Sequence, residues 1–263
     1  LLDSRADEIG PVLNHGAPEL ELMLSNGTAE QAASCPIWLG EPDTAAALLA
    51  QGAKPKWLQS TWAGFKPLLA DGLPRAYRLS RAVGVFGQPI AEYVIAYMLR
   101  HELRLGERQI SQEERRWDHR LPGSLADKNV LIVGAGEIGC EVAGFLRPFG
   151  VELYGIVSTP RQRPDFKRIM SLAELPAAVP EADYVINLLP DTSATTDIYD
   201  ASLFAAMKPS ALFINVGRGS AVVDDDLRAA LCDAQIAGAV LDVFRQEPVS
   251  YTHLRAHETS AHL

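Results

Sequence analysis

The chain has 263 residues, of which 48% are hydrophobic and 22% charged, a composition typical of a globular protein with room for two domains. Its net charge of −9 and its pI near 5.2 disfavour a nucleic-acid partner or an anionic membrane surface. No apolar run approaches the ~20 residues of a membrane helix, so we expect a cytoplasmic protein with no membrane partner.

Three cysteines, Cys35, Cys140 and Cys232, are widely spaced and form no CxxC pair. An odd number at such spacing favours small core residues in a reducing compartment over a disulfide framework or a metal site. The sequence therefore predicts no bound metal.

The first part of the chain alternates short apolar runs with a helical pattern. Residues 1–3 resemble the end of a strand, and because strands usually have ~5–6 residues we expect the natural chain to begin further upstream. A helix is predicted over Asp43–Gln51, beginning at an Asp N-cap. Four apolar runs are predicted strands: Leu20–Leu24, Pro36–Leu39, Trp57–Ser60 and Tyr77–Leu79.

A long helix is predicted to open at Pro89, because proline is tolerated in a first helical turn. We interpret its apolar stripe as core rather than as a dimer contact, and His101 as a half-buried histidine. The charged stretch Glu113–Arg120 is interpreted as a solvated linker or helix end, with Trp117 packed beneath it. The stripe comprises Ile90, Tyr93, Val94, Tyr97, Met98 and His101.

The second part of the chain repeats the alternation, which is the pattern of βαβ units and of a doubly wound parallel sheet. Predicted strands lie at 129–133, 151–157, 183–189, 211–216 and 238–242, and predicted helices at 137–149, 201–207 and 224–234. We place the boundary between two domains near Gly87–Gln88.

A glycine-rich turn follows the first of these strands, in the sequence VLIVGAGEIG at 130–139. Gly134 would allow the tight turn, Gly136 would let backbone approach a pyrophosphate, and Gly139 would let the next helix pack on its strand. A purely structural turn is the alternative. The apolar strand before it and the amphipathic stretch Cys140–Phe149 after it favour a dinucleotide site at a helix N-terminus.

A second candidate site lies at Arg218, between two glycines and just past a predicted buried strand. Strand ends of this kind face the cleft of a doubly wound sheet, and a planar guanidinium suits bidentate binding of a carboxylate. A surface arginine in a turn is the alternative reading.

Together, these motifs resemble the D-isomer-specific 2-hydroxyacid dehydrogenase family, and its glyoxylate/hydroxypyruvate reductase branch in particular. The resemblance covers roughly residues 1–249. It implies an α/β protein with a flavodoxin-like substrate domain at 1–87, a Rossmann NAD(P)-binding domain at 88–249, and a homodimer. The segments that carry it are the glycine-rich turn, LFINVGRGSAVVDDDL (212–227), GAVLDVF (238–244), RQEP (245–248), WLQSTWAGF (57–65) and GVFGQPIAEYV (84–94).

The resemblance also implies roles for individual residues. Arg218 would be catalytic, and Glu247 would pair with a histidine and keep it protonated as the general acid. In the family, the substrate carboxylate is met by a loop, here Ser60–Phe65, with Gly84–Gly87 as a hinge or second pocket edge. The cofactor contacts would be Gly134, Gly136, Glu137, Ile138, Gly139, Leu189, Pro190, Thr192, Val216, Gly217, Arg218 and Asp242, and the substrate contacts Trp62, Ala63, Gly64 and Arg218.

The choice of nucleotide depends on the position of the family's ribose-binding acidic residue, which falls here at Val157. Val157 is followed by Ser158, Thr159 and Arg161, with Arg163 close behind. An acidic residue would repel a 2′-phosphate, whereas hydroxyls and an arginine attract it. The sequence therefore favours NADP over NAD, with NAD still possible.

Residues 250–263 have no relation to the hydrophobic pattern before them, and we treat this tail as foreign to the fold. Its histidines, His253, His257 and His262, follow Glu247 too soon and outside the family's Pro-His context. No residue is a credible proton donor, so we expect this chain to be impaired as an enzyme.

The leading hypothesis is an NADPH-dependent oxidoreductase that reduces a small 2-keto acid such as glyoxylate or hydroxypyruvate. A non-catalytic dinucleotide-binding regulator of the same fold is the alternative, because fold does not fix function. A Rossmann methyltransferase is disfavoured by the VGRGS and LDVF segments.

Overall fold

A computed structural model describes residues 1–24 and 28–247 and divides the chain into two compact units. The first unit is Leu1–Val85 and the second begins at Phe86, two residues before the predicted boundary.

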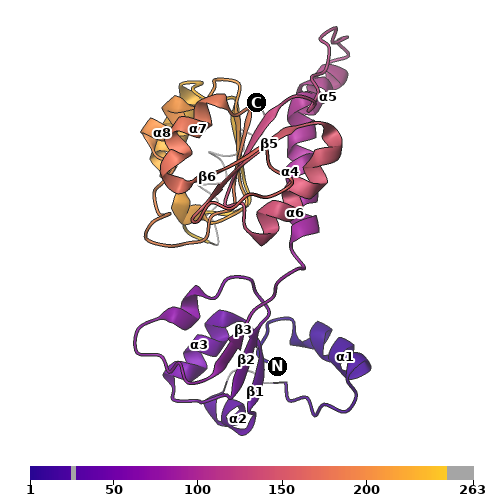
Figure 1. The fold of residues 1–263 in the computed structure, drawn as a ribbon. Helices are drawn as coiled ribbons and strands as arrows, with labels where there is room; N and C mark the ends of the chain where they lie inside the picture. The colour runs from indigo at the N-terminus through magenta and orange to yellow at the C-terminus, as the bar shows by residue number, and fades with distance from the viewer. Residues whose placement is uncertain (25–27, 248–263) are drawn as a thin grey trace. The chain divides into compact units, whose positions relative to one another are not determined.

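The first unit is built on a small parallel sheet in the order β1-β2-β3 (Figure 1). Leu2 adds a parallel bridge to Gly40 beside β1, as its strand-like sequence predicts. The core gathers around the fully buried Trp38, Leu48 and Leu58. The elements are α1 (Ala6–Gly16), α2 (Ala29–Ser34), β1 (Ile37–Gly40), α3 (Pro42–Ala50), β2 (Trp57–Ser60), η1 (Lys66–Leu69) and β3 (Arg78–Ser80).

Several predictions for this unit need correction. The strand predicted at Leu20–Leu24 is wrong, because this segment is irregular and Leu20, Met23 and Leu24 are 50%, 41% and 49% exposed. The helix predicted from an Asp N-cap begins one residue earlier, at Pro42, and Asp43 lies in its first turn without capping it. The helices α1 and α2 were not predicted.

The second unit is a six-stranded sheet whose paired strands are all parallel, in the order β6-β5-β4-β7-β8-β9. The chain starts in the middle at β4, builds outward to β6, and returns to β7 on the other side of β4. This reversal confirms the doubly wound fold. The strands are β4 (Asn129–Val133), β5 (Glu152–Val157), β6 (Arg168–Ser171), β7 (Tyr184–Asn187), β8 (Leu212–Asn215) and β9 (Gly238–Leu241).

Helices cover both faces of this sheet. The helices α4 and α6 pack together on one face, while α7, α8 and α9 lie on the other (Figure 1). The helices are α4 (Gly87–Glu102), α5 (Leu105–Glu113), α6 (Glu137–Leu146), η2 (Arg147–Phe149), η3 (Leu172–Glu174), α7 (Leu175–Ala178), η4 (Val179–Glu181), α8 (Ala201–Ala206), η5 (Gly219–Ala221) and α9 (Asp224–Cys232).

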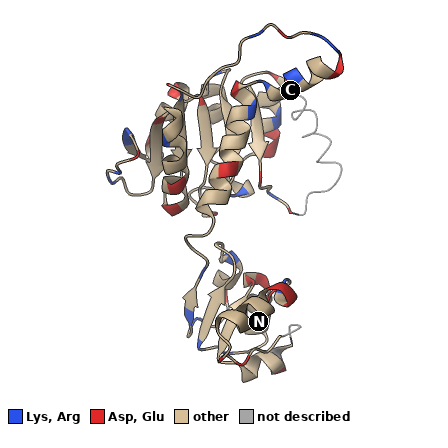
Figure 2. Cartoon of the chain, turned by 90° about the vertical axis from the view of Figure 1, so that its right-hand side faces the viewer, with Lys and Arg blue, Asp and Glu red and all other residues tan. Residues whose placement is uncertain are grey.

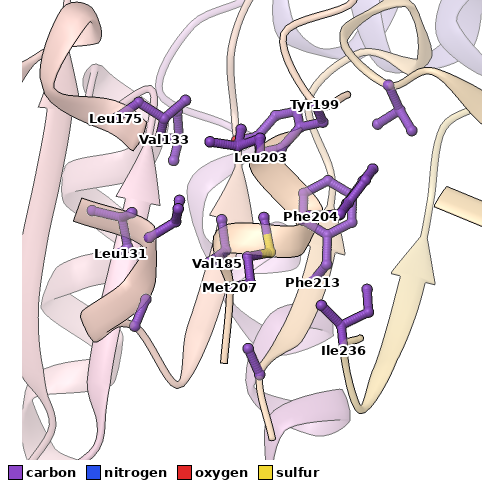
Figure 3. Packing of buried hydrophobic residues seen from close by; sticks show 14 of the residues in the cluster. Leu131, Val133, Leu175, Val185, Tyr199, Leu203, Phe204, Met207, Phe213 and Ile236 are labelled. Carbon is purple, nitrogen blue, oxygen red and sulfur yellow. The ribbon is translucent and has the colours of Figure 1, made fainter. Parts of the chain in front are cut away.

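Two hydrophobic clusters, one on each face, fix the sheet. In one of them, Tyr199, Phe204 and Phe213 form an aromatic group, with the rings of Phe204 and Phe213 in edge-to-face contact at 5.5 Å (Figure 3). Most charged residues lie on helices and loops (Figure 2). In the sheet, β5 and β6 carry Glu152 and Arg168, whereas β4, β7, β8 and β9 carry no charged residue. The sheet is therefore a rigid apolar support for the loops at its ends.

The prediction of a core stripe on α4 is confirmed at its centre. Val94 and Met98 are fully buried, but Tyr97 is 37% exposed, and the helix begins at Gly87 rather than Pro89. Burial lowers the pKa of the half-buried His101, as its position in the stripe suggests.

Other predictions for the second unit are wrong. Trp117 is 79% exposed instead of packed beneath its charged neighbours. Cys232 is exposed, while Cys35 and Cys140 are half-buried. The helix α5 and the strand β6 were not predicted, because both are rich in polar residues. Within residues 1–24 and 28–247, no helix has the length and apolar character needed to span a membrane.

Candidate functional site

The glycine-rich turn joins β4 to α6, and two of its glycines are required by packing. Gly134 has φ of +101°, and a Cβ there would lie 2.6 Å from the carbonyl carbon of Leu188. A Cβ on Gly139 would lie 2.6 Å from the carbonyl oxygen of Gly134. These positions therefore need glycine for the tight turn and for the close approach of α6, as the sequence predicts.

Gly136 differs from its neighbours because its missing side chain leaves open space. A Cβ there would find only the Gly134 oxygen, at 4.0 Å, and the residue itself is exposed. Gly136 caps α6, so the amides of the first turn, from Glu137 to Gly139, have no carbonyl of their own helix to bind. This is a backbone cradle with the positive end of a helix dipole, which fits the pyrophosphate of a dinucleotide.

The β5 strand ends beside this turn, since the amides of Gly134 and Ala135 both donate to the Ile156 oxygen, at 3.0 and 2.9 Å. After β5, Ser158, Thr159 and Arg161 are exposed. Among the described residues, none gives Arg161 a hydrogen bond or an ion pair, so its guanidinium is available to an anion.

A buried pair of asparagines organises the ends of β7 and β8, and sequence reasoning missed it. Asn187 and Asn215 are register partners, both with 0% exposure. The Nδ2 of Asn187 donates to Oδ1 of Asn215 at 2.9 Å. The only available signal was an asparagine at the last position of two apolar strands.

These asparagines hold the backbone that follows each strand. Oδ1 of Asn187 accepts from the Leu189 amide and Oδ1 of Asn215 accepts from the Gly217 amide, both at 3.2 Å. The Nδ2 of Asn215 donates to the Arg218 carbonyl at 3.2 Å. The polar atoms of the two buried asparagine side chains find hydrogen-bond partners in the loop backbone. These hydrogen bonds fix the loops to the sheet.

In the segment after β7, one apolar residue is buried in the core and the residues that follow it are exposed. Leu189 is 6% exposed and belongs to the core, while Pro190 and Thr192 are exposed. The buried hydroxyl of Thr195 donates to the Pro190 carbonyl at 2.6 Å and accepts from the Thr192 amide at 3.0 Å. The turn that would face the nucleotide is therefore held by its own hydrogen bonds.

Arg218 is exposed directly after β8. Val216, two positions before it, is 6% exposed and packs in the core. A Cβ on Gly217 would lie 2.9 Å from the Leu189 oxygen, so the ends of β7 and β8 touch through backbone. The Nη1 of Arg218 donates to the Gly217 carbonyl at 2.6 Å, which leaves its other N–H groups for a carboxylate.

The segment 244–247 packs on the turn that carries Arg218. Gly219 has no room for a Cβ because the backbone of Phe244 and Arg245 lies against it. Arg245 contacts the carboxylate of Asp197 and the Val222 carbonyl, and Oε1 of Glu247 accepts from the Phe244 amide at 2.7 Å. The structure thus brings the segments of Arg218 and Glu247 together, with both side chains exposed.

Asp242 follows β9 and is exposed, with its amide donating to the Asn215 carbonyl at 3.0 Å. The ring of His101, in contrast, lies 6.0 Å from the ring of Tyr184, measured between centroids. Tyr184 is the first residue of β7, so His101 lies at the opposite edge of the sheet. The tail histidines His253, His257 and His262 lie outside the described residues.

The candidate substrate loop belongs to the first unit and follows β2. The hydroxyl of the buried Ser60 accepts from the Trp62 amide at 3.1 Å and donates to the Trp62 carbonyl at 3.0 Å. Thr61 donates to the buried carboxylate of Asp3 at 2.6 Å. Trp62 is 49% exposed, and Ala63 and Gly64 are half-buried.

In the second unit, every candidate segment follows the carboxyl end of a strand: β4, β5, β7, β8 or β9. Because the strands are parallel, these ends share one edge of the sheet, and β4 and β7 flank the point where the winding reverses. That is where doubly wound sheets bind their ligands.

Comparison with known proteins agrees with this geometry. Residues 95–261 match the family model described as D-isomer specific 2-hydroxyacid dehydrogenase, NAD binding domain. A glyoxylate/hydroxypyruvate reductase A from Yersinia enterocolitica is 36% identical over 162 residues, which are 62% of this chain and 52% of that protein. One from Serratia proteamaculans is 35% identical over 166 residues, covering 63% and 53%. The chain thus spans about half the length of these relatives.

Solved structures are similar over more of the chain. A D-isomer specific 2-hydroxyacid dehydrogenase family protein from Aeromonas salmonicida has a TM-score of 0.87 at 32% identity, covering 95% of this chain and 82% of that one. An NADPH-dependent glyoxylate/hydroxypyruvate reductase from Sinorhizobium meliloti, in complex with NADP and sulfate, has a TM-score of 0.73 at 28% identity, covering 82% and 71%. The chain therefore belongs to the D-isomer specific 2-hydroxyacid dehydrogenase family.

Proposed function

We propose that the protein is an NADPH-dependent oxidoreductase that reduces a small 2-keto acid, such as glyoxylate or hydroxypyruvate, to the 2-hydroxy acid. The observation that carries the proposal is the exposed Arg218, fixed by Asn215 at the same sheet edge as the glycine-rich turn. The names of the Yersinia, Serratia and Sinorhizobium relatives support the substrate class.

The cofactor would lie along this edge. The first-turn amides from Glu137 to Gly139 would hold the pyrophosphate, and Asp242 would accept from the carboxamide. NADPH is favoured over NADH because Val157 stands where an acidic residue would meet the ribose, and Arg161 has no partner within the described part of the chain. When bound, NADPH supplies the hydride.

The chain's own residues would bind and orient the substrate. The guanidinium of Arg218 would hold the carboxylate and polarise the keto group, because its fork of donors matches both oxygens. Glu247 would stabilise the protonated form of a general acid placed next to it. The substrate contacts expected at Trp62, Ala63 and Gly64 of the first unit stay a prediction. Homodimer formation, which the resemblance implies, and a cytoplasmic location, which the composition and cysteine spacing suggest, stay predictions.

A proton donor is the one part of this arrangement that the described residues do not supply. Within residues 1–24 and 28–247, no histidine follows the carboxyl end of a strand. The absence of a positioned general acid typically costs ~10²–10⁴-fold in rate. We therefore expect slow turnover that added imidazole increases.

The test is a titration with NADPH and NADH, followed by NADPH oxidation in the presence of glyoxylate, with and without imidazole. We expect NADPH to bind at least about tenfold more tightly, in line with one charge-assisted contact. Arg218→Ala should abolish the imidazole-dependent turnover while reducing NADPH affinity far less, since Arg218 is only one of several expected cofactor contacts. Arg228→Ala, on the exposed surface of α9, should change neither.

Two results would contradict the proposal. Equal affinity for the two nucleotides would remove the NADPH assignment. Tight NADPH binding with no glyoxylate reduction under any condition would instead favour a dinucleotide-binding regulator.

A further inference from the structure

The loop between β5 and β6 carries the residues proposed to meet the 2′-phosphate, and its two halves differ. Ser158, Thr159 and Arg161 are exposed. The second half is tied down, because Phe166 is 3% exposed in the core and Asp165 pairs with Arg147 at 2.9 Å. The anchors of the second half therefore determine where the exposed half lies.

Arg163 is the anchor nearest to the exposed half. Its Nη1 donates to Sγ of Cys140 at 2.9 Å, and both side chains are half-buried. Cys140 lies in the first part of α6, and its thiol donates onward to the Ala135 carbonyl at 3.7 Å. Ala135 stands between Gly134 and Gly136. A chain of contacts thus links the β5–β6 loop to the glycine-rich turn.

Two local features support this link. A Cβ on Gly155 would lie 3.0 Å from both Ala135 and Phe166. Because Gly155 has no side chain, the glycine-rich turn and the β5–β6 loop can approach each other across β5. Burial raises the pKa of the Cys140 thiol and outweighs the opposing effect of Arg163. The thiol therefore stays protonated at neutral pH and can donate to Ala135 while accepting from Arg163.

We propose that Arg163 is a positioning residue for nucleotide selectivity: through Cys140 it holds Ser158–Arg161 next to the glycine-rich turn, where the 2′-phosphate and the pyrophosphate would be met together. The inference rests on the proposed NADPH site. Its physical basis is preorganisation, since a loop that is ordered only upon binding reduces affinity by the entropy it loses.

This role makes a prediction that differs between the two nucleotides. NADPH needs the loop for its 2′-phosphate, whereas NADH has no such group and depends on the glycine-rich turn. Loss of the anchor should therefore weaken NADPH binding and leave NADH binding nearly unchanged. Damage to the fold would weaken both.

The experiment measures dissociation constants of NADPH and NADH for the full chain and for Arg163→Ala, Cys140→Val and their double variant. We expect each single variant to bind NADPH about tenfold more weakly, the size expected for one or two residues ordered only upon binding. NADH affinity should stay within about twofold. The double variant should be no worse than either single one, because both remove the same contact.

Matched variants complete the test. Cys140→Ser keeps an atom that accepts and donates, and should restore most of the NADPH preference. Cys232→Val and Arg228→Ala replace an exposed cysteine and an exposed arginine away from the loop and should change neither constant. Arg161→Ala should remove more of the preference than Arg163→Ala.

The outcomes separate the two proposals. If the unaltered chain prefers NADPH but the anchor variants keep that preference, or lose both nucleotides together, the role of Arg163 is wrong and the proposed function stands. Additive losses in the double variant would also overturn that role. If the unaltered chain shows no preference for NADPH, both proposals are wrong.

Discussion

The two units place their candidate residues at the same kind of position but support them differently. In the second unit, β7 and β8 are buried along their whole length between two clusters of 17 and 20 buried residues. In the first unit, β1 and β2 alternate between buried and open positions over a cluster of nine. Ile37 and Trp57, at the start of these strands, are 56% and 36% exposed.

We therefore expect a strand-end loop to be held as firmly as the sheet beneath it. Each unit fixes its loop with a buried polar residue at the last position of a strand, Ser60 in the first and the Asn187–Asn215 pair in the second. The second unit covers both faces of its sheet, so we expect it to keep its site when the first unit is weakened.

Leu58→Ala should lower the free energy of unfolding of the first unit by about 2–5 kcal/mol, because Leu58 is fully buried in its small core. NADPH affinity should stay within about twofold. Urea unfolding and a nucleotide titration measure the two effects, with Val12→Ala, at a 70% exposed position, as the control. A large loss of NADPH affinity would show that the second unit depends on the first.

Gly134→Ala and Gly136→Ala should separate stability from binding within one turn. The first should destabilise the second unit by about 2–4 kcal/mol, since it combines a positive φ with a clash against the Leu188 backbone. The second should fold normally and bind NADPH about tenfold more weakly, because its Cβ enters open space. The opposite result for Gly136→Ala, an unfolded second unit whose folded fraction still binds NADPH with unchanged affinity, would contradict the placement of the pyrophosphate at the first turn of α6.

Asn215→Ala and Ser60→Ala compare the two buried polar anchors. Asn215 contacts Asn187, Gly217 and Arg218, so its loss should cost about 1–3 kcal/mol. Ser60 has two contacts with the single residue Trp62, and its loss should cost about 1 kcal/mol. Chemical unfolding followed by circular dichroism gives both values, and an equal or reversed order would contradict the comparison.

Tyr199→Phe should leave the second unit equally stable or up to about 1 kcal/mol more stable. Its hydroxyl is fully buried and has no hydrogen-bond partner among the described residues, in a cluster where its ring packs 4.7 Å from that of Phe213 (Figure 3). Thermal unfolding checks this. A clear loss of stability would reveal a partner for the hydroxyl.

The parts of the fold that the sequence predicts well are those with two independent signals. The strand at 129–133 is apolar and is followed by a glycine turn, and its bounds match β4. The run Leu20–Leu24 is equally apolar, but Leu20, Met23 and Leu24 are exposed and the run forms no strand. The elements α5 and β6 contain few apolar residues, so tertiary packing rather than the sequence pattern determines them.

The candidate site shows the same limit. A glycine-rich turn can be recognised from the sequence alone, and Gly134 and Gly139 have the packing roles expected of them. The Asn187–Asn215 pair becomes meaningful only once β7 and β8 lie side by side in register. The contact between Arg163 and Cys140 likewise joins residues that no sequence spacing relates.

The central claim, that a dinucleotide binds at the carboxyl edge of the larger sheet, is tested most directly by an NADPH titration followed through backbone amide chemical shifts. The predicted result is a set of large shifts at Gly136–Gly139 and Ser158–Arg161, with smaller ones after β7 and β8. Shifts confined to the opposite edge, around His101 and Tyr184, or no shifts at saturating NADPH, would contradict it.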